Sequence, residues 1–141
     1  MGRVEVTLFL DACIVIYWVE APDPFHSRLM EHLRSLRQQH PDATFAVSRL
    51  SWLECMVKPL RDKDATLLEA YREFFEARHL QIVALSARVV ERAASLRAEH
   101  ELKTPDALQA ASALEVDGEL LFITNDHRFR KISALRVEIP K

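Results

Sequence analysis

Four acidic residues stand at boundaries between apolar runs and helices or loops: Asp11, Glu54, Asp106 and Asp126. Asp11 ends the apolar run 8–10, and Asp126 comes shortly after the run 120–123. In an open parallel sheet, ligands bind in the crevice at the carboxyl ends of the strands, so these side chains can face one crevice. Carboxylates gathered there repel one another unless a cation joins them. Mg²⁺ and Mn²⁺ prefer such oxygen ligands, and two bound ions can stabilise the attacking and leaving oxygens of a phosphoryl displacement.

The segment 102–114 is predicted to hold Asp106 in the first turn of a buried helix. Thr104 is expected as its N-cap, and Pro105 suits the first helical position. The residues that follow are strong helix formers with one apolar face. Taken alone, a first-turn Asp can simply complement the helix dipole, and this remains the alternative for Asp106.

Glu54 lies soon after the predicted strand 44–47 and near the start of a helix. Either Ser48 or Ser51 is expected to cap that helix. If Ser51 is the cap, Glu54 stands at the position of a capping box, which would explain it without a metal. Spacing alone leaves both roles open.

The remaining chain alternates strands with helices. Strands are predicted at 3–10, 44–47, 80–85 and 120–123, with a last, edge strand at 137–139. Helices are predicted to cover 12–19, 24–38 and the segments that begin at 48 or 51, 64, 86 and 104, the first and third ending near prolines and the last at Asp117-Gly118. Strands that alternate with helices predict an α/β fold, a three-layer α/β/α sandwich with a mainly parallel central sheet. Since there is no internal repeat or linker, residues 1–141 are expected to form one domain.

The composition excludes several classes of protein. An apolar content of 49% and a charged content of 28% are typical of a folded, soluble domain. No apolar run approaches the roughly 20 residues of a membrane span and no signal peptide is evident, so a cytoplasmic location is expected. The net charge of −2 argues mildly against a nucleic-acid partner. Basic residues nevertheless flank two of the acids: Arg49, Lys58, Arg61, Lys63, Arg128, Arg130 and Lys131.

The rarer residues narrow the choice further. With only Gly2 and Gly118, the chain has no glycine-rich loop for a nucleotide phosphate. Cys13 and Cys55 fit neither a disulfide framework nor a zinc site, and both are interpreted as small buried hydrophobes. An aspartyl-phosphate phosphatase would need a second Asp in the place of Cys13, and a phospho-receiver domain would need an acidic pair near the first strand and a late lysine.

Four short stretches, taken together and in order, resemble the PIN domain, a metal-dependent nuclease fold, and most closely its VapC-type toxins. They are FLDAC (9–13), SWLE (51–54), TPDALQAA (104–111) and ITND (123–126). The resemblance spans almost the whole chain. Where many members have Thr or Ser after the first Asp this chain has Ala12, and at the next position it has Cys13 instead of a small polar residue, which puts a supporting hydroxyl there in doubt.

The resemblance implies an endoribonuclease that depends on Mg²⁺ or Mn²⁺. A water molecule would attack an RNA phosphodiester and leave a 5′-phosphate. The metal ligands, direct or through water, would be Asp11, Glu54, Asp106 and Asp126. Without binding the metal directly, Thr124 would orient Asp126 or a bound water, and Asn125 would contact a phosphate or a metal-bound water.

The resemblance also implies partners. VapC-type toxins are held inactive by an antitoxin whose tail crosses an apolar groove, and they form homodimers. Candidates for the groove are Trp18, Trp52, Leu53 and Met56, with ordinary core packing as the alternative for each. Two other functions remain open: a PIN-like module that binds RNA or protein without cleavage, and a solitary RNA-processing nuclease of the same fold.

Overall fold

All strand pairs of the central sheet are parallel, in the order β3-β2-β1-β4-β5, in a computed structural model that describes residues 5–140. The strands are β1 (Val6–Leu10), β2 (Thr44–Ser48), β3 (Leu80–Val83), β4 (Glu119–Ile123) and β5 (Val137–Glu138). The parallel sheet is thus confirmed, and β5 lies at its edge as predicted. The first two residues of the predicted strand 3–10 lie outside the described residues.

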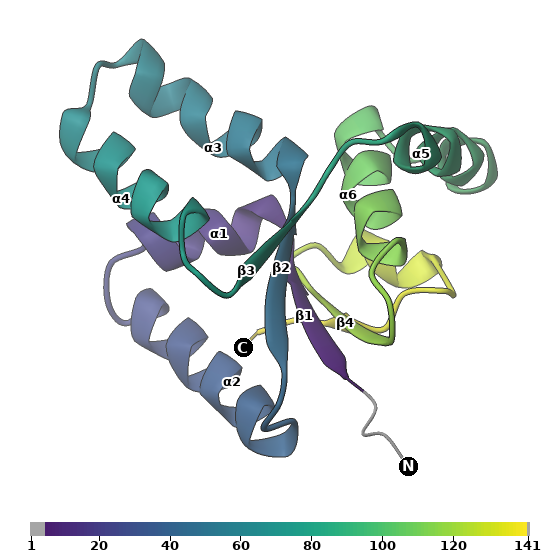
Figure 1. Cartoon of the computed structure of the whole chain (residues 1–141), viewed down its shortest axis with the longest axis horizontal. Coiled ribbons are helices and arrows are strands. Elements are labelled where there is room, and N and C mark those ends of the chain that lie inside the picture. The colour runs from purple at the N-terminus through teal and green to yellow at the C-terminus, as the bar shows by residue number, and fades with distance from the viewer. Residues whose placement is uncertain (1–4, 141) are drawn as a thin grey trace.

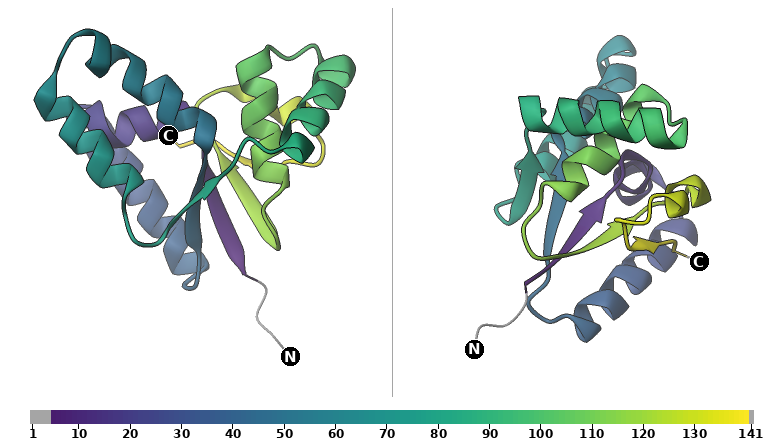
Figure 2. Two further views of the ribbon diagram at one scale, coloured as in Figure 1. Left: turned by 45° about the horizontal axis from the view of Figure 1, so that its top comes forward. Right: turned by 90° about the vertical axis from the view of Figure 1, so that its right-hand side faces the viewer.

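Helices cover both faces of this sheet (Figure 1). One face carries α1 (Ala12–Glu20), α2 (Phe25–Gln39), α3 (Arg49–Arg61) and α4 (Ala65–Phe75). The other carries α5 (Ala87–His100), α6 (Thr104–Leu114) and the short 3₁₀ helix η1 (His127–Lys131). Figure 2 shows the two groups of helices on either side of the strands, which confirms the three-layer α/β arrangement. Among residues 5–140, no helix combines the length and the apolar character that a membrane span requires.

Each face of the sheet has its own hydrophobic core because successive side chains of a strand point in opposite directions. Leu8 and Leu10 of β1 pack into the core under α1–α4. Phe9 points the other way and stacks on Phe122 of β4, with 5.6 Å between ring centroids, in the core under α5 and α6. These β1 side chains are fully buried, as expected of the central strand of a parallel sheet.

The strand order reverses at β1. From β1 the chain proceeds through β2 to β3 on one side and then returns to place β4 on the other side of β1. Leu10 is in register with Ile123 of β4, and the backbone N–H of Asp11 donates to the Ile123 carbonyl over 3.0 Å. A crevice that can bind ligands is expected at this switch point, beyond the ends of β1 and β4.

Side-chain caps define most helix starts. Ser48 caps α3 by accepting from the Leu50 N–H over 3.1 Å, Asp64 caps α4, and Ser86 caps α5. The capping box of Ser51 and Glu54 is therefore excluded, since Ser51 lies inside α3 and is fully buried. Helix α2 begins one residue later than the predicted range 24–38, because Pro24 is its N-cap and Phe25 its first residue. The Asp23 carboxylate accepts from the Ser27 N–H over 3.1 Å.

The start of α6 differs from the prediction. Thr104 is the first helical residue, the N-cap is Lys103, and no side chain caps this end. The Thr104 hydroxyl accepts instead from Arg97 of α5 over 3.0 Å, so it joins the two helices. Pro105 consequently occupies the second helical position, where its missing N–H is still harmless. Two other ends differ from the predicted ones. Strand β3 ends at Val83, two residues before the predicted end. Helix α6 ends at Leu114 because a turn begins three residues before Gly118.

Candidate active site

Asp11 is a buried carboxylate at the end of the central strand. It is 8% exposed and is the N-cap of α1. One carboxylate oxygen accepts from the Ala12 N–H over 2.9 Å, and the other accepts from the Thr124 hydroxyl over 2.7 Å. Burial raises the pKa of Asp11 despite these hydrogen bonds, and the charge of Asp106 raises it further. The helix N-terminus and two strong donors therefore hold a charge that burial disfavours.

Thr124 joins the ends of β1 and β4. Its hydroxyl donates to Asp11 and accepts from the Asp126 N–H over 3.1 Å, and the side chain is completely buried. One hydroxyl thus fixes the orientation of Asp11 and the start of the loop that carries Asp126. The side chain of Asn125 is exposed, and its backbone N–H donates to the Cys13 sulfur over 3.5 Å.

Cys13 is part of this network, which the sequence reasoning missed. Its thiol donates to the same Asp11 oxygen as Thr124, over 3.4 Å, and lies 3.7 Å from the Thr124 hydroxyl. Burial and then the Asp11 charge raise the pKa of the thiol to about 12, so it is protonated at neutral pH and available as a donor. The thiol occupies the place where a small polar side chain was expected, two residues after Asp11.

Glu54 is held by a side chain from the opposite layer. Gln109 of α6 is 2% exposed, and its amide nitrogen donates to Glu54 over 3.0 Å and to Ser51 over 2.9 Å. Partial burial raises the pKa of Glu54, and the charges of Asp11 and Asp106 raise it further. A second polar contact, 2.8 Å between two hydroxyls, joins Ser112 of α6 to Ser48, the N-cap of α3. The role of Gln109 was not predicted from the sequence, although this residue lies three positions after Asp106.

Asp106 and Asp126 share a basic partner. Asp126 caps η1 and forms a two-pronged ion pair with Arg128, with contacts of 2.6 Å from the terminal nitrogen and 3.0 Å from Nε. The pairing lowers the pKa of Asp126. The same terminal nitrogen of Arg128 lies 3.7 Å from Asp106 in the first turn of α6.

The four predicted acids thus form two connected groups. Repulsion between charges links Asp11, Glu54 and Asp106: the charge of Asp106 raises the pKa of Asp11, and the charges of Asp11 and Asp106 raise the pKa of Glu54. Asp126 is tied to Asp106 through Arg128 and to Asp11 through Thr124. Within residues 5–140, no three His, Cys, Asp or Glu side chains are gathered closely enough to hold a metal ion as they stand.

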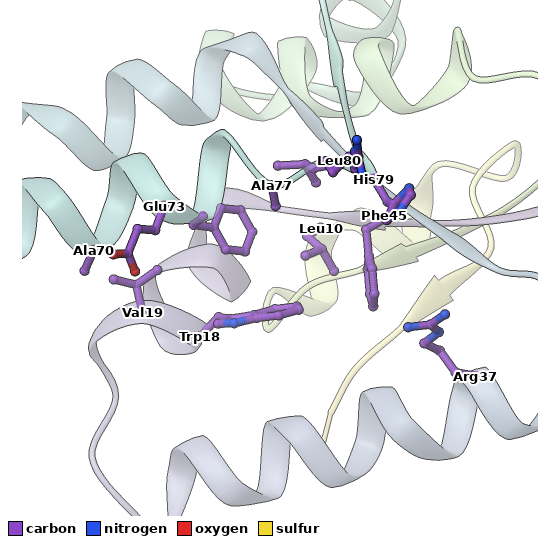
Figure 3. Close-up of a pocket in the computed structure, with 12 residues that line it drawn as sticks. Leu10, Trp18, Val19, Arg37, Phe45, Ala70, Glu73, Ala77, His79 and Leu80 are labelled. Atoms are coloured by element: carbon purple, nitrogen blue, oxygen red, sulfur yellow. The ribbon is translucent and has the colours of Figure 1, made fainter.

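A separate apolar cavity of about 570 Å³ lies on the α1–α4 face of the sheet (Figure 3). Trp18 of α1 forms one wall and meets the rings of Phe45 and Phe74 edge to face, with centroids 5.5 and 5.2 Å apart. Arg37 and Glu73 are among the charged residues that line it. Of the four candidates for an apolar groove, only Trp18 lines this cavity: Met56 is buried in the core, Trp52 packs on Phe75, and Leu53 is exposed on α3.

A sequence model of the PIN domain matches residues 8–135. The chain belongs to the PIN domain family. This is a family of nucleases, so the carboxylate site lies in a fold associated with phosphodiester hydrolysis. No curated protein matches the sequence.

Solved structures show the same fold at low sequence identity. VapBC2 from Rickettsia felis, bound to a promoter DNA fragment, is 22% identical with a TM-score of 0.75, over 96% of this chain and 99% of that one. A toxin–antitoxin complex from Klebsiella pneumoniae is 24% identical with a TM-score of 0.70, over 95% and 98%. FitAcB from Neisseria gonorrhoeae is 17% identical with a TM-score of 0.66, over 92% and 95%.

The hydrogen bond from Thr124 to Asp11 gives the first testable prediction. Thr124→Val removes a donor to a buried carboxylate, so we expect the free energy of unfolding at neutral pH to fall by about 2 kcal/mol. The substitution raises the pKa of Asp11 in the folded state further above its unfolded value. The loss of stability of Thr124→Val relative to the unsubstituted protein is therefore full at neutral pH. This deficit shrinks as the pH falls through the raised pKa, because the folded variant then binds a proton at Asp11 more strongly than the unfolded chain does.

Urea unfolding at neutral and acid pH measures this deficit. Thr124→Ser is the matched control because it keeps the hydroxyl, and any loss from its missing methyl group should not change with pH. A deficit of Thr124→Val that is the same at both pH values would show that Thr124 acts through the hydrogen bond it accepts from the Asp126 N–H and not by stabilising the Asp11 charge.

Proposed function

We propose that this protein is a divalent-cation-dependent endoribonuclease and the toxin of a VapBC-type toxin–antitoxin pair. The observation that carries the proposal is that the charges of Asp11, Glu54 and Asp106 interact beside the end of the central strand of a PIN-domain sheet. The toxin–antitoxin part rests on the similar structures, several of which are toxin–antitoxin complexes.

The donor chemistry fits a hard divalent cation. Asp11, Glu54 and Asp106 are carboxylates, the charge of Asp106 raises the pKa of Asp11 and Glu54, and a cation between the three would relieve that repulsion. The buried carbonyl oxygen of Gln109 has no hydrogen-bond partner within residues 5–140, and amide oxygens also bind Mg²⁺ or Mn²⁺. We infer that Asp11, Glu54 and Asp106 hold the cation and that Asp126 takes part, directly or through water, when it is not paired with Arg128.

The cation, when bound, would lower the pKa of a water molecule and neutralise charge on the reacting phosphate. The residues of the chain would do the positioning. Thr124 and Cys13 fix the Asp11 carboxylate, and Gln109 fixes Glu54, so that each presents its remaining lone pairs to the crevice. Asn125, exposed beside them, would contact a phosphate.

Cleavage of RNA tests the catalytic part of this proposal. Metal-stripped protein incubated with total cellular RNA should give discrete fragments only after Mg²⁺ or Mn²⁺ is added. Asp106→Asn removes one ligand charge, and we expect cleavage to fall by at least about a hundredfold, as for the loss of a charged group that acts in the transition state. Gel analysis of the fragments is the readout.

The matched control is Glu91→Gln, which removes an exposed acid from α5 and should leave cleavage unchanged. Calorimetry of Mn²⁺ binding to the same preparation separates the rival functions. Bound Mn²⁺ without cleavage of any RNA would contradict the nuclease activity for those substrates, and the absence of both would favour a non-catalytic binding module.

The apolar cavity beside Trp18 is the proposed docking site of the antitoxin. We expect Ala77→Arg, which places a long cation on the wall of this cavity, to weaken the complex with the product of the neighbouring gene by at least tenfold. RNA cleavage by the free protein should be unaffected. Ala98→Arg adds the same side chain at an exposed position of α5 and is the control. Equal affinities of the two variants would contradict this docking site.

We also propose a homodimer that buries an exposed apolar stripe on α3. Leu53, Val57 and Leu60 lie on one face of this helix and are 59%, 50% and 56% exposed. Leu53→Glu should therefore convert the dimer to a monomer in sedimentation velocity, because it would bury an unpaired charge in the interface. An unchanged sedimentation coefficient would place the interface elsewhere.

A further inference from the structure

Arg128 contacts two of the four predicted metal ligands at once. Its Nε lies 3.0 Å from both oxygens of Asp126, and its terminal nitrogen lies 2.6 Å from one of them. That terminal nitrogen is also 3.7 Å from the Asp106 carboxylate on α6. The two acids belong to different parts of the fold: Asp126 is the N-cap of η1, and Asp106 lies in the first turn of α6.

The contacts with Arg128 occupy carboxylate lone pairs that a metal ion would need. A planar guanidinium that binds a carboxylate in a two-pronged geometry engages both of its oxygens. The Arg128 side chain is 62% exposed, whereas the side chains of Asp106 and Asp126 are 27% and 28% exposed. Little packing therefore holds Arg128 in place, and its position depends on the charges of the two acids.

A local ion pair on the surface of η1 would explain the contact with Asp126 but not the one with Asp106. Asp106 lies 22 positions before Arg128 in the chain, in helix α6, and its charge repels those of Asp11 and Glu54. Arg128 thus places its positive charge at the side of the cluster where a cation is expected.

We propose that Arg128 is an internal counter-ion of the carboxylate site, which binds Asp126 and Asp106 in the metal-free protein and competes with the divalent cation for them. This inference rests on the cation site of the proposed function. Cation binding then requires the guanidinium to leave Asp126, and Arg128 lowers the apparent affinity for the cation. The chain itself would thereby set the cation concentration at which the site fills.

Arg128→Gln tests the competition, with Arg130→Gln as the matched control. Arg130 lies on the same short helix, is exposed, and forms no ion pair with the four acids in the described part of the chain. Calorimetric titration of the metal-stripped full chain with Mn²⁺ should give binding roughly two- to fivefold tighter for Arg128→Gln than for Arg130→Gln, the effect expected for an exposed ion pair.

The metal-free protein provides a second readout that does not depend on nuclease activity. Without its counter-ion the acid cluster repels itself, so Arg128→Gln should melt roughly 1–3 °C below Arg130→Gln in the presence of a chelator. Equal melting temperatures would overturn the counter-ion role. Mn²⁺ binding of equal affinity in the two variants would overturn the competition alone, whereas no Mn²⁺ binding by any variant would overturn the cation site of the proposed function as well.

Discussion

A carboxylate buried at the end of the central strand is the constraint on which this site depends. Asp11 can keep its charge only if donors replace the water it has lost. Those donors are the N–H at the start of α1, the hydroxyl of Thr124 at the end of β4, and the thiol of Cys13. The register of β1 with β4 brings Thr124 into position, so the pairing that completes the sheet also solvates the acid.

The second requirement is to hold like charges close together. Glu54 belongs to α3 and Asp106 to α6. These helices pack on opposite faces of the sheet and approach each other beyond the carboxyl ends of its strands (Figure 2). The contact between these helices is polar: Gln109 and Ser112 of α6 face Ser51 and Ser48. Apolar packing would hold the helices equally well, but it would not orient Glu54. The polar contact therefore couples the relative position of the two layers to the position of an acid.

The sequence allowed the fold to be predicted, and it placed the candidate site at the ends of the strands, because both inferences depend on local patterns. Apolar runs that end in acids marked the strand ends, and the order of the elements indicated the parallel sheet. The direction of long side chains could not be predicted in this way. The pairing of Asp126 with Arg128 depends on the turn of η1, and the contact of Thr104 with Arg97 depends on how α5 and α6 cross.

Local patterns also could not tell which of the candidate residues line an apolar groove. Trp18, Trp52 and Met56 are all large apolar side chains near the predicted site, and their sequence neighbours do not distinguish a cavity wall from a filled core. Trp18 makes edge-to-face contacts with Phe45 and Phe74 and lines the cavity, whereas Trp52 makes the same kind of contact with Phe75 but does not line it. Such differences arise from the packing of helices that are distant in sequence.

Helix α1 connects the two surfaces that the proposed function needs. Asp11 caps its first turn, and Trp18 and Val19 in its last turns line the apolar cavity. Seven helical residues span about 11 Å along the axis. Three or four residues of extended chain cover the same distance. A partner of the proposed kind, anchored in the cavity, would therefore need only a short extended segment to cover the distance from Trp18 to Asp11 along this helix.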